Sequence, residues 1–537
     1  MKVVQRIYGV FLKRPWLGYV LVFLLTLAIY GATQAHPSMR DPDSFYHARI
    51  AAMTMESGPV RDFPWLPYTT LSENFADHHF LYHIALIPFI AIWGPLAGTK
   101  IAAALFGALA ILAVYTLMRT LRVRFPCVFA LMLATLDNFM FRMNLAKTSS
   151  LSIIILMLGI VAMMRRKPWL LAPLAFIYVW TYAGWPILSV IAAAFLVSAL
   201  VVRLLERRFK DRLIRPGNDP VSVGIKALVA TVIGSAAGLV INPFFPANLK
   251  FYLAQIGHIT VLNYSEVIKV GVEWYPYPFM AIVRQNGSLF FIATIVFALL
   301  VSALVWKKEA GSALRPFGRC NATAIVFIAL LTTAFLILTL KSRRHVEYFI
   351  PFMMLLNAVM FTAVMRRVEF RKLWDAVFGR FLILGKLVAV LLIVIIPILA
   401  IRDANAIHSL FRGGPAWTRL QDVTDWMDGR VPEGDIVFHS NWSDFPALFY
   451  HAPEFRYISG LDPTFFYLQS PKLYEDWMTL RYGEYGDRTA EIVRERFGSD
   501  YIMIRRVGDE SFEEAIESDP TLQLVYEDDE VRVYTGL

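Results

Sequence analysis

The chain has 537 residues, of which 57% are apolar, and its mean hydropathy is +0.52. These values exclude a soluble globular protein and predict a membrane protein with several spans. The net charge of +10 is unevenly spread, because acids outnumber bases about two to one after residue 402. The excess of Lys and Arg therefore belongs to the membrane part, where it follows topology, and we expect no nucleic acid as a partner.

Apolar runs of about 17–22 residues match the hydrocarbon thickness that a helix must cross. We predict eleven spans, the first of which is a retained signal anchor behind a basic N terminus. A twelfth apolar stretch, Phe80–Trp93, contains His83 and Pro88 and is interpreted as a helix along the membrane interface. The spans are 15–35, 98–118, 124–141, 149–164, 168–184, 186–204, 223–242, 288–306, 322–340, 348–365 and 381–401.

Loop charge sets the expected orientation, because Lys and Arg resist translocation. The N terminus is then cytoplasmic, and the protein is a multi-pass protein of the inner (plasma) membrane. On this topology the basic clusters share the inner side, at 119–124, 165–167, 203–215, 307–308 and 366–372. The segments expected outside are 36–97, 142–148, 243–287, 341–347 and 402–537.

Two domains are predicted. Residues 1–402 form a transmembrane domain with large outer loops at 36–97 and 243–287, and residues 403–537 form an extracytoplasmic α/β domain. In the second domain short apolar strands alternate with helical stretches, which is typical of a small α/β fold. The predicted strands are 436–438, 457–458, 501–504 and 531–534, and the helices are 489–497 and 511–518.

Charged residues next to apolar spans are costly, so they are usually paired, solvated or functional. Asp43, in D-P-D-S-F-Y-H-A-R, is flanked by aromatic residues whose low-dielectric setting makes a carboxylate a stronger base toward a hydroxyl or amide proton. The alternative is an Asp that caps a helix beginning at Ser44. Asp77, His78 and His79 could ligate a divalent metal or bind a sugar, or could form an ordinary polar loop.

Glu273 lies beside Trp274 in the aromatic stretch E-W-Y-P-Y-P. Aromatic rings around a carboxylate suit a carbohydrate or an extended acceptor, but they are also typical of the belt at a membrane interface. Because the predicted topology puts Asp43, Glu273 and Arg344 on one face, we expect the three to meet in an outward-facing cavity.

Arg344 offers a planar fork for a phosphate group and stands beside Arg343 at the outer end of a span. Glu347 could pair one of these cations. Arg142 and Lys147 lie in a short outer loop. Cations on the outer side run against the positive-inside rule, which favours a functional role. Such fixed cations stabilise the negative charge that develops when a phosphate leaves a sugar.

At these residues the chain resembles the GT-C superfamily of membrane glycosyltransferases, and within it the catalytic subunit of oligosaccharyltransferase. The acidic motif of that family's first outer loop matches Asp43, and the glutamate of its long fifth outer loop matches Glu273 in V-G-V-E. An arginine seven residues before a proline matches Arg344 and Pro351. The aromatic end of an outer helix is similar to Ile177–Pro186.

The resemblance implies a polytopic GT-C-like fold, a polyprenyl-linked glycan donor and an extracytoplasmic acceptor. Asp43 and Glu273 would be catalytic. The residues expected to bind the donor phosphate are Arg344, Arg343, Lys147 and Arg142. The residues expected to bind the acceptor or substrate are His47, His78, His79, Trp274, Trp442 and Asp444.

The chain departs from the family pattern at the second acidic motif, which supplies metal ligands in the family. Ser149 and Leu151 stand at the corresponding positions. A divalent metal, Mg or Mn, with Asp43 and Asp77 as candidate ligands, is therefore an open question, and the cations of the same outer loop would replace part of its charge.

Two further departures concern the acceptor and the span count. The peptide-reading W-W-D motif has only a remnant in N-W-S-D-F, residues 441–445. The family typically has thirteen spans, and two are missing before the Glu273 loop. Recognition of an Asn-x-Ser/Thr acceptor is therefore not carried over to this chain.

We predict a membrane glycosyltransferase that moves a sugar or oligosaccharide from a polyprenyl-(pyro)phosphate donor to an extracytoplasmic protein, glycan or lipid. The alternative is a metal-independent transferase that moves one sugar onto a glycan or lipid. A lipid-glycan flippase is a less favoured alternative, because no internal repeat is evident. A non-catalytic assembly subunit is the remaining one.

Overall fold

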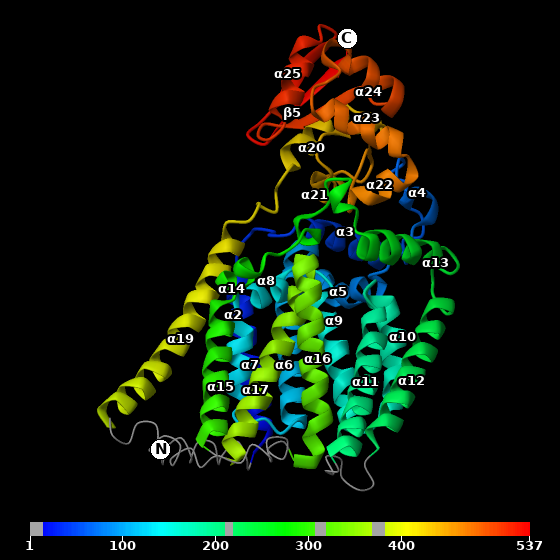
Figure 1. The fold of residues 1–537 in the computed structure, drawn as a ribbon. Helices are drawn as coiled ribbons and strands as arrows, with labels where there is room; N and C mark the ends of the chain where they lie inside the picture. The colour runs from blue at the N-terminus through cyan, green and yellow to red at the C-terminus, as the bar shows by residue number, and fades with distance from the viewer. Residues whose placement is uncertain (1–13, 210–218, 307–317, 368–381, 537) are drawn as a thin grey trace. The chain divides into compact units, whose positions relative to one another are not determined.

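The computed structural model describes residues 14–209, 219–306, 318–367 and 382–536 (Figure 1). Contacts between residues divide the chain into two compact units. The first comprises Met1–His36, Ala103–Gly238 and Glu273–Arg412, and the second comprises Pro37–Ala102, Leu239–Val272 and Gly413–Leu537.

Apolar helices form the first unit, and aliphatic and aromatic side chains fill its interior. In it α16 packs against both α17 and α11. The long helices are α2 (Trp16–Gln34), α6 (Pro95–Thr120, which begins in the second unit), α11 (Pro186–Phe209), α12 (Pro220–Val240), α15 (Gly287–Trp306), α16 (Gly318–Lys341), α17 (Val346–Arg367) and α19 (Leu382–Arg412). The shorter ones are α7 (Pro126–Thr135), α8 (Asp137–Asn144), α9 (Ser149–Met164), α10 (Leu171–Thr181) and α14 (Phe279–Gln285).

A glycine fixes the position of α8 within this unit. A Cβ atom at Gly107 of α6 would lie 2.7 Å from the Tyr30 ring of α2 and 2.8 Å from the carbonyl oxygen of Met143. Only glycine allows this approach, since real Cβ contacts are longer. The C-terminal end of α8 is therefore held between α2 and α6, where it carries Arg142 into the interior.

Among the described residues, seven helices are long and apolar enough to cross a membrane, and nine candidate spans result if each of two bent pairs counts as one. The axes of α7 and α8 differ by 74°, and those of α14 and α15 by 92°. The first bend lies at Leu136, whose ψ of 126° is extended and interrupts the helix. The polytopic helical fold is as predicted, but the number of eleven spans is not confirmed: the predicted span 124–141 is broken at this bend.

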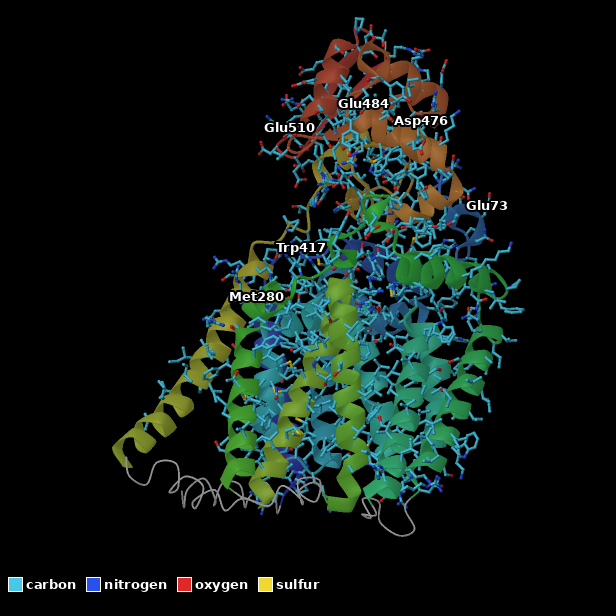
Figure 2. All side chains as sticks on the ribbon, in the orientation of Figure 1. Glu73, Met280, Trp417, Asp476, Glu484 and Glu510 are labelled. Atoms are coloured by element: carbon cyan, nitrogen blue, oxygen red, sulfur yellow. The ribbon has the colours of Figure 1, made fainter. Side chains whose placement is uncertain are left out.

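The second unit combines short helices with an α/β region. Its helices before residue 273 are α3 (Asp43–Ser57), α4 (Leu71–Asn74), α5 (Phe80–Trp93), α13 (Ala247–Tyr252) and the π-helical turn η2 (Leu253–Leu262). Figure 2 shows all side chains, and acidic residues such as Asp476, Glu484 and Glu510 lie in the α/β region, in line with the acidic composition of the C-terminal part.

A five-stranded sheet in the order β2-β1-β3-β5-β4 organises the α/β region. β1 is parallel to β2 and β3, whereas β5 is antiparallel to β3 and β4. The central strands are buried because their apolar runs are covered on both faces. The strands are β1 (Ile436–His439), β2 (Arg456–Tyr457), β3 (Tyr501–Arg505), β4 (Leu522–Glu527) and β5 (Val531–Gly536). The helices are α20 (Gln421–Met427), α21 (Phe445–His451), α22 (Pro463–Gln469), α23 (Pro471–Arg481), α24 (Thr489–Phe497) and α25 (Glu510–Ser518).

The predicted α/β fold of the C-terminal part is confirmed. All four predicted strands and both predicted helices are present. β4 was missed because its sequence, L-Q-L-V-Y-E, is an exposed edge strand without a buried face. Contacts also place residues 37–102 and 239–272 in one unit with this region. The predicted division of the chain at residue 402 is drawn on another criterion, membrane topology, and stays a prediction.

Candidate active site

Arg142 is brought into the interior of the first unit by α8. Its neighbours Phe139, Met140 and Met143 are fully buried and anchor that helix in the core. The same packing takes Arg142 out of water, since only 6% of the residue is exposed. A buried charge is stable only when it is paired and hydrogen-bonded, and two carboxylates do this here.

Glu347, in the first turn of α17, is the first of these carboxylates and is completely buried. Arg142 donates from Nε to Glu347 Oε2 over 2.8 Å, and its Nη2 lies 2.7 Å from the same oxygen. Ser149 Oγ, at the start of α9, also donates to this oxygen, over 2.9 Å. Glu347 Oε1 has no hydrogen-bond partner among the described residues. The carboxylate is therefore only half satisfied.

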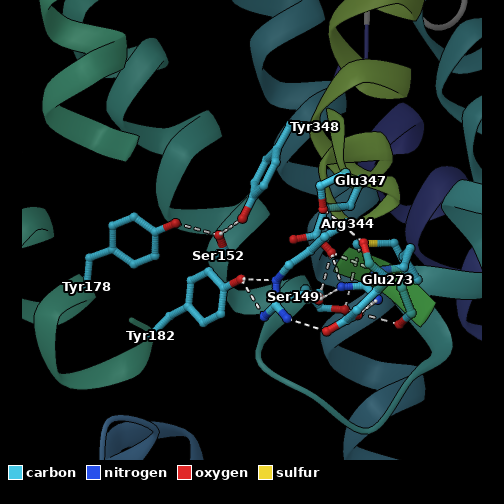
Figure 3. A network of polar contacts seen from close by, with 12 residues as sticks. Ser149, Ser152, Tyr178, Tyr182, Glu273, Arg344, Glu347 and Tyr348 are labelled. Atoms are coloured by element: carbon cyan, nitrogen blue, oxygen red, sulfur yellow. Dashed lines mark hydrogen bonds and ion pairs between the residues drawn. The ribbon is translucent and has the colours of Figure 1, made fainter. Parts of the chain in front are cut away.

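Glu273 supplies the second carboxylate, which bridges two arginines (Figure 3). Its Oε2 accepts from Arg142 Nη1 over 2.8 Å, and its Oε1 accepts from Arg344 Nη1. Arg344 also donates from Nη2 and Nε to the Tyr182 hydroxyl, over 2.9 and 3.3 Å. Its guanidinium carbon lies 4.9 Å from the centroid of the Trp274 ring, a cation–π contact.

Electrostatics keep Glu273 ionised. Burial alone would raise the pKa of this carboxyl, but Arg344, Arg142 and Lys147 together hold its pKa well below the usual range. A carboxylate with such a low pKa is a weak proton acceptor at neutral pH. Glu273 is therefore ionised while it is paired with these arginines, and its predicted catalytic role stays a prediction.

A row of hydroxyl groups lies beside the arginine cluster (Figure 3). Ser152 Oγ is 2.5 Å from the Tyr178 hydroxyl and 3.3 Å from the Tyr348 hydroxyl. All three residues are fully buried. Buried hydroxyls that hydrogen-bond to one another hold their side chains rigidly. These three side chains therefore form a rigid surface next to Tyr182 and Arg344.

The structure brings together three of the residues predicted from the sequence: Arg142, Glu273 and Arg344. Lys147 is close enough to lower the pKa of Glu273. Arg343, predicted beside Arg344, is exposed and lies over the Tyr277 ring at 5.4 Å. Its role in phosphate binding stays a prediction.

Two contributors to the site lay outside the predicted set. Glu347 pairs with Arg142 and not with the neighbouring Arg343 or Arg344, and Tyr182 orients Arg344. Tyr182 stands in the aromatic helix end that carried part of the family resemblance. That motif was the one sequence signal that could have identified it.

The second unit holds a buried chain of two histidines and one acid. His47 Nδ1 lies 2.9 Å from His83 Nε2, and His83 Nδ1 lies 2.7 Å from Asp77 Oδ2. All three residues are at most 5% exposed. The carboxylate of Asp77 accepts a hydrogen bond from His83 Nδ1–H, and the other ring nitrogen of His83 shares a hydrogen bond with His47 Nδ1. This chain fixes the ring of His47, next to the ring of His79 at 5.1 Å between centroids.

Asp43 and His47 lie one turn apart on α3 and therefore on one face of it. The helix begins at Asp43 itself, whose backbone N–H donates to Asp41 Oδ1 over 3.0 Å. The N-cap position of this helix is Pro42, so Asp43 is its first residue and not the cap of a helix that begins at Ser44. His78 packs on Phe251 of α13, with 4.8 Å between ring centroids, and is part of the aromatic packing of this unit.

Asp444 and Trp442, the acceptor-binding candidates of the C-terminal part, lie in one 3-10 turn, η8 (Trp442–Asp444). Asp444 is 1% exposed and holds two arginines: Oδ1 accepts from Arg419 over 2.7 Å, and Oδ2 accepts from Arg505 over 2.8 Å. These ion pairs stabilise the buried charge of Asp444 within the folded chain, without any ligand. Its role in acceptor binding stays a prediction, as does that of the half-buried Trp442.

Solved structures share the fold of this chain, with its apolar helices around the arginine–carboxylate cluster and its small α/β region. The apo oligosaccharyltransferase of Archaeoglobus fulgidus is similar with a TM-score of 0.59, 14% identity and coverage of 92% of this chain and 70% of that one. ArnT from Cupriavidus metallidurans gives 0.52 and 14%, over 97% and 98% of the two chains.

Arabinofuranosyltransferase AftD from mycobacteria is also similar, with a TM-score of 0.55, 14% identity and coverage of 97% of this chain but only 40% of that one. No protein-family model and no curated protein matches the sequence. At this identity the likeness is one of fold. The predicted resemblance to GT-C proteins, and to oligosaccharyltransferase among them, is confirmed at that level.

The Archaeoglobus protein has also been solved with Zn and sulfate, at a TM-score of 0.52 and 14% identity, over 90% of this chain and 68% of that one. Whether this chain can hold a metal ion depends on the side chains that each unit offers as ligands. In the first unit both carboxylates of the cluster bind arginines, and Ser149 stands where the family has an acid. A metal ion at this position would lie next to two positively charged guanidinium groups, which would repel it.

In the second unit Asp77 accepts from His83 through Oδ2 and from the backbone N–H of His79 through Oδ1, over 3.0 Å. Within the part of the chain that the structure describes, no group of three His, Cys, Asp or Glu side chains could hold a metal ion. Both oxygens of Asp77 already accept hydrogen bonds within the protein, and the Mg or Mn site considered at Asp43 and Asp77 stays a prediction.

Proposed function

We propose that this chain is a membrane glycosyltransferase that transfers a sugar or oligosaccharide from a polyprenyl-(pyro)phosphate donor to an acceptor outside the cytoplasm. One observation carries the proposal: the buried Arg142 and the half-buried Arg344 converge on a single anionic group inside a GT-C-like helical unit. Paired guanidinium forks are the arrangement that binds phosphate oxygens best. The fold shared with three glycosyltransferases supports the same activity.

In this mechanism Arg344 and Arg142 bind the phosphate of the donor, and Lys147 adds a third positive charge. The bond between the anomeric carbon and the phosphate oxygen breaks, and its electron pair stays on the phosphate. Cations that are already in place stabilise this charge without reorganisation. Tyr182 keeps Arg344 in its orientation throughout, because its hydroxyl accepts two hydrogen bonds from that guanidinium.

The acceptor's nucleophile forms the new bond to the anomeric carbon and gives up its proton. We assign that proton to Asp43, and Glu273 assists across the pocket. His47, one turn from Asp43 on α3 and fixed by His83, would contact the same acceptor. We further propose that the helices lie in the inner membrane, with the N terminus in the cytoplasm and the α/β region outside it.

A metal-independent transferase that moves one sugar onto a glycan or lipid is the second candidate. It is favoured by the arginine pairing of both cluster carboxylates. ArnT, AftD and oligosaccharyltransferase all share the fold of this chain. The fold therefore does not distinguish a peptide acceptor from another acceptor.

The test is to incubate the purified full chain with labelled polyprenyl-linked glycans and membrane extract, and to identify the labelled product by mass spectrometry. A labelled peptide supports the first candidate, and a labelled glycan or lipid supports the second. Asp43→Asn should abolish transfer while donor binding is kept. A flippase would move the donor across a vesicle without transfer, and an assembly subunit would be unaffected by Asp43→Asn; either result contradicts the proposal.

A further inference from the structure

The carboxylate of Glu273 is bound in the way in which a phosphate would be bound. Each of its oxygens accepts from a different arginine, Oε2 from Arg142 and Oε1 from Arg344. A carboxylate and a phosphate both present two oxygens to guanidinium N–H groups, and both are recognised by the same forks. The site thus already contains an anion, supplied by the chain itself.

Both arginines have further partners that do not depend on Glu273. Arg142 is held by Glu347 Oε2 through Nε and Nη2. Arg344 is held by the Tyr182 hydroxyl through Nη2 and Nε. If the Glu273 side chain left, each guanidinium would keep its position and would present a free N–H group to another anion.

Glu273 itself can leave without unfolding of the backbone around it. Its carbonyl oxygen accepts from Ser342 Oγ over 2.9 Å, and two residues later the carbonyl of Tyr275 accepts from the Arg343 N–H over 3.1 Å. These bonds hold the main chain, not the side chain. The side chain is 24% exposed, whereas that of Glu347 is 0% exposed. A rotation about its own bonds therefore gives the carboxylate access to water.

The cluster also contains a buried acceptor that nothing in the described residues satisfies. Glu347 Oε1 has no donor, although buried polar atoms nearly always have one. A hydroxyl group of a bound sugar would supply this hydrogen bond. The missing donor is a second and independent indication that the site is completed by a ligand with hydroxyl groups.

We propose that Glu273 is a self-ligand: its carboxylate occupies the position of the donor's phosphate between Arg142 and Arg344, and the lipid-linked phosphate displaces it on binding. This inference rests on the proposed function and specifies how its donor is bound. It also assigns Glu347 as the residue that holds Arg142 in place and meets a donor hydroxyl. The ionised Glu273 carboxylate and the donor phosphate compete for the same N–H groups. This competition lowers the apparent affinity of the chain for its donor.

The test measures the affinity of undecaprenyl phosphate for the purified full chain in detergent, for the wild type and for Glu273→Gln. The amide cannot compete as an anion, so we expect the variant to bind at least about tenfold more tightly, which corresponds to about 1.4 kcal/mol. Glu266→Gln is the matched control: this exposed acid precedes Glu273 in the same loop, and its removal should leave the affinity unchanged. Arg344→Ala should abolish binding.

The outcomes separate the two proposals. If Glu273→Gln binds no more tightly than the wild type while Arg344→Ala still loses the lipid phosphate, the donor site holds and the self-ligand is wrong. If Arg344→Ala binds like the wild type, the proposed function itself fails. Thermal unfolding verifies that each variant is folded, and Glu273→Ala, which also removes the anion, takes the place of the amide variant should that one not fold.

Discussion

Arg142 and Glu347 form a buried ion pair in which Nε and Nη2 lie 2.8 and 2.7 Å from one carboxylate oxygen. The pair joins α8 to α17 across 205 positions of the sequence. Because neither side chain has significant exposure to water, the two charges are stable only together. The site is thus built on an interaction that also holds the helices in register.

Arg142→Ala should destabilise the protein strongly. It leaves Glu347 as a buried and unpaired charge, and breaking such a pair lowers the free energy of unfolding by about 3–5 kcal/mol. A denaturant titration of the full chain in detergent measures this loss. Arg343→Ala, which removes an exposed arginine, should change the stability by no more than about 0.5 kcal/mol. Equal losses of unfolding free energy in the two variants would contradict a stabilising role of the buried Arg142–Glu347 pair.

Acid should weaken the α/β region through His439 of β1. Burial lowers the pKa of this imidazole to about 4, although Asp444 opposes the shift. Its Nδ1–H donates to the Asn441 carbonyl over 3.0 Å, and its Nε2 accepts from the Ser459 N–H over 3.4 Å, so the neutral ring is the one that fits. In the unfolded chain the pKa returns to about 6.5, and the unfolded state then binds a proton that the folded state does not.

The stability of this region is consequently full above pH 6.5 and falls as the pH drops toward 4, by about 1.4 kcal/mol per unit. Hydrogen exchange of the β1 and β3 amides in the full chain, measured between pH 7 and pH 5, reports it. In His439→Gln the slope over this window should disappear. A variant that keeps the same slope would place the acid sensitivity elsewhere.

A chelator should leave activity intact. The carboxylates of the first unit are paired with arginines and Asp77 is held by His83, so we expect sugar transfer to continue in EDTA within about twofold of the untreated rate. Added Mn²⁺ or Mg²⁺ should not increase it. Complete loss in EDTA with recovery on addition of metal would contradict the arginine-based site.

The sequence indicates the charged residues of the site better than it indicates their partners. Arg142, Glu273 and Arg344 stand out because charges beside apolar spans need a reason. The pairing of Arg142 with Glu347 does not follow from either motif, because it depends on how α8 packs against α17. Likewise His83 lies in an apolar stretch, and only folding brings it between His47 and Asp77.

Helix breaks and edge strands are the parts of the fold that the sequence conceals. No proline or glycine stands at Leu136, and the prediction counts the polar pair Asp137 and Asn138 that follows as part of a single span at 124–141, where α7 and α8 bend by 74°. The strands β1 and β3 were found because burial on both faces requires continuous apolar runs. β4 has no such requirement at the edge of the sheet.

The most direct measurement is sugar transfer from a labelled polyprenyl-linked donor in proteoliposomes, compared among the wild type, Arg344→Ala and Lys341→Ala, which removes an exposed cation nearby. Removing a fixed donor at a developing oxyanion costs about 10²–10³ in rate. We expect a loss of that size for Arg344→Ala and no more than a few-fold loss for its exposed neighbour. Full transfer by Arg344→Ala, or the same loss in both variants, would contradict a phosphate site built on this arginine pair.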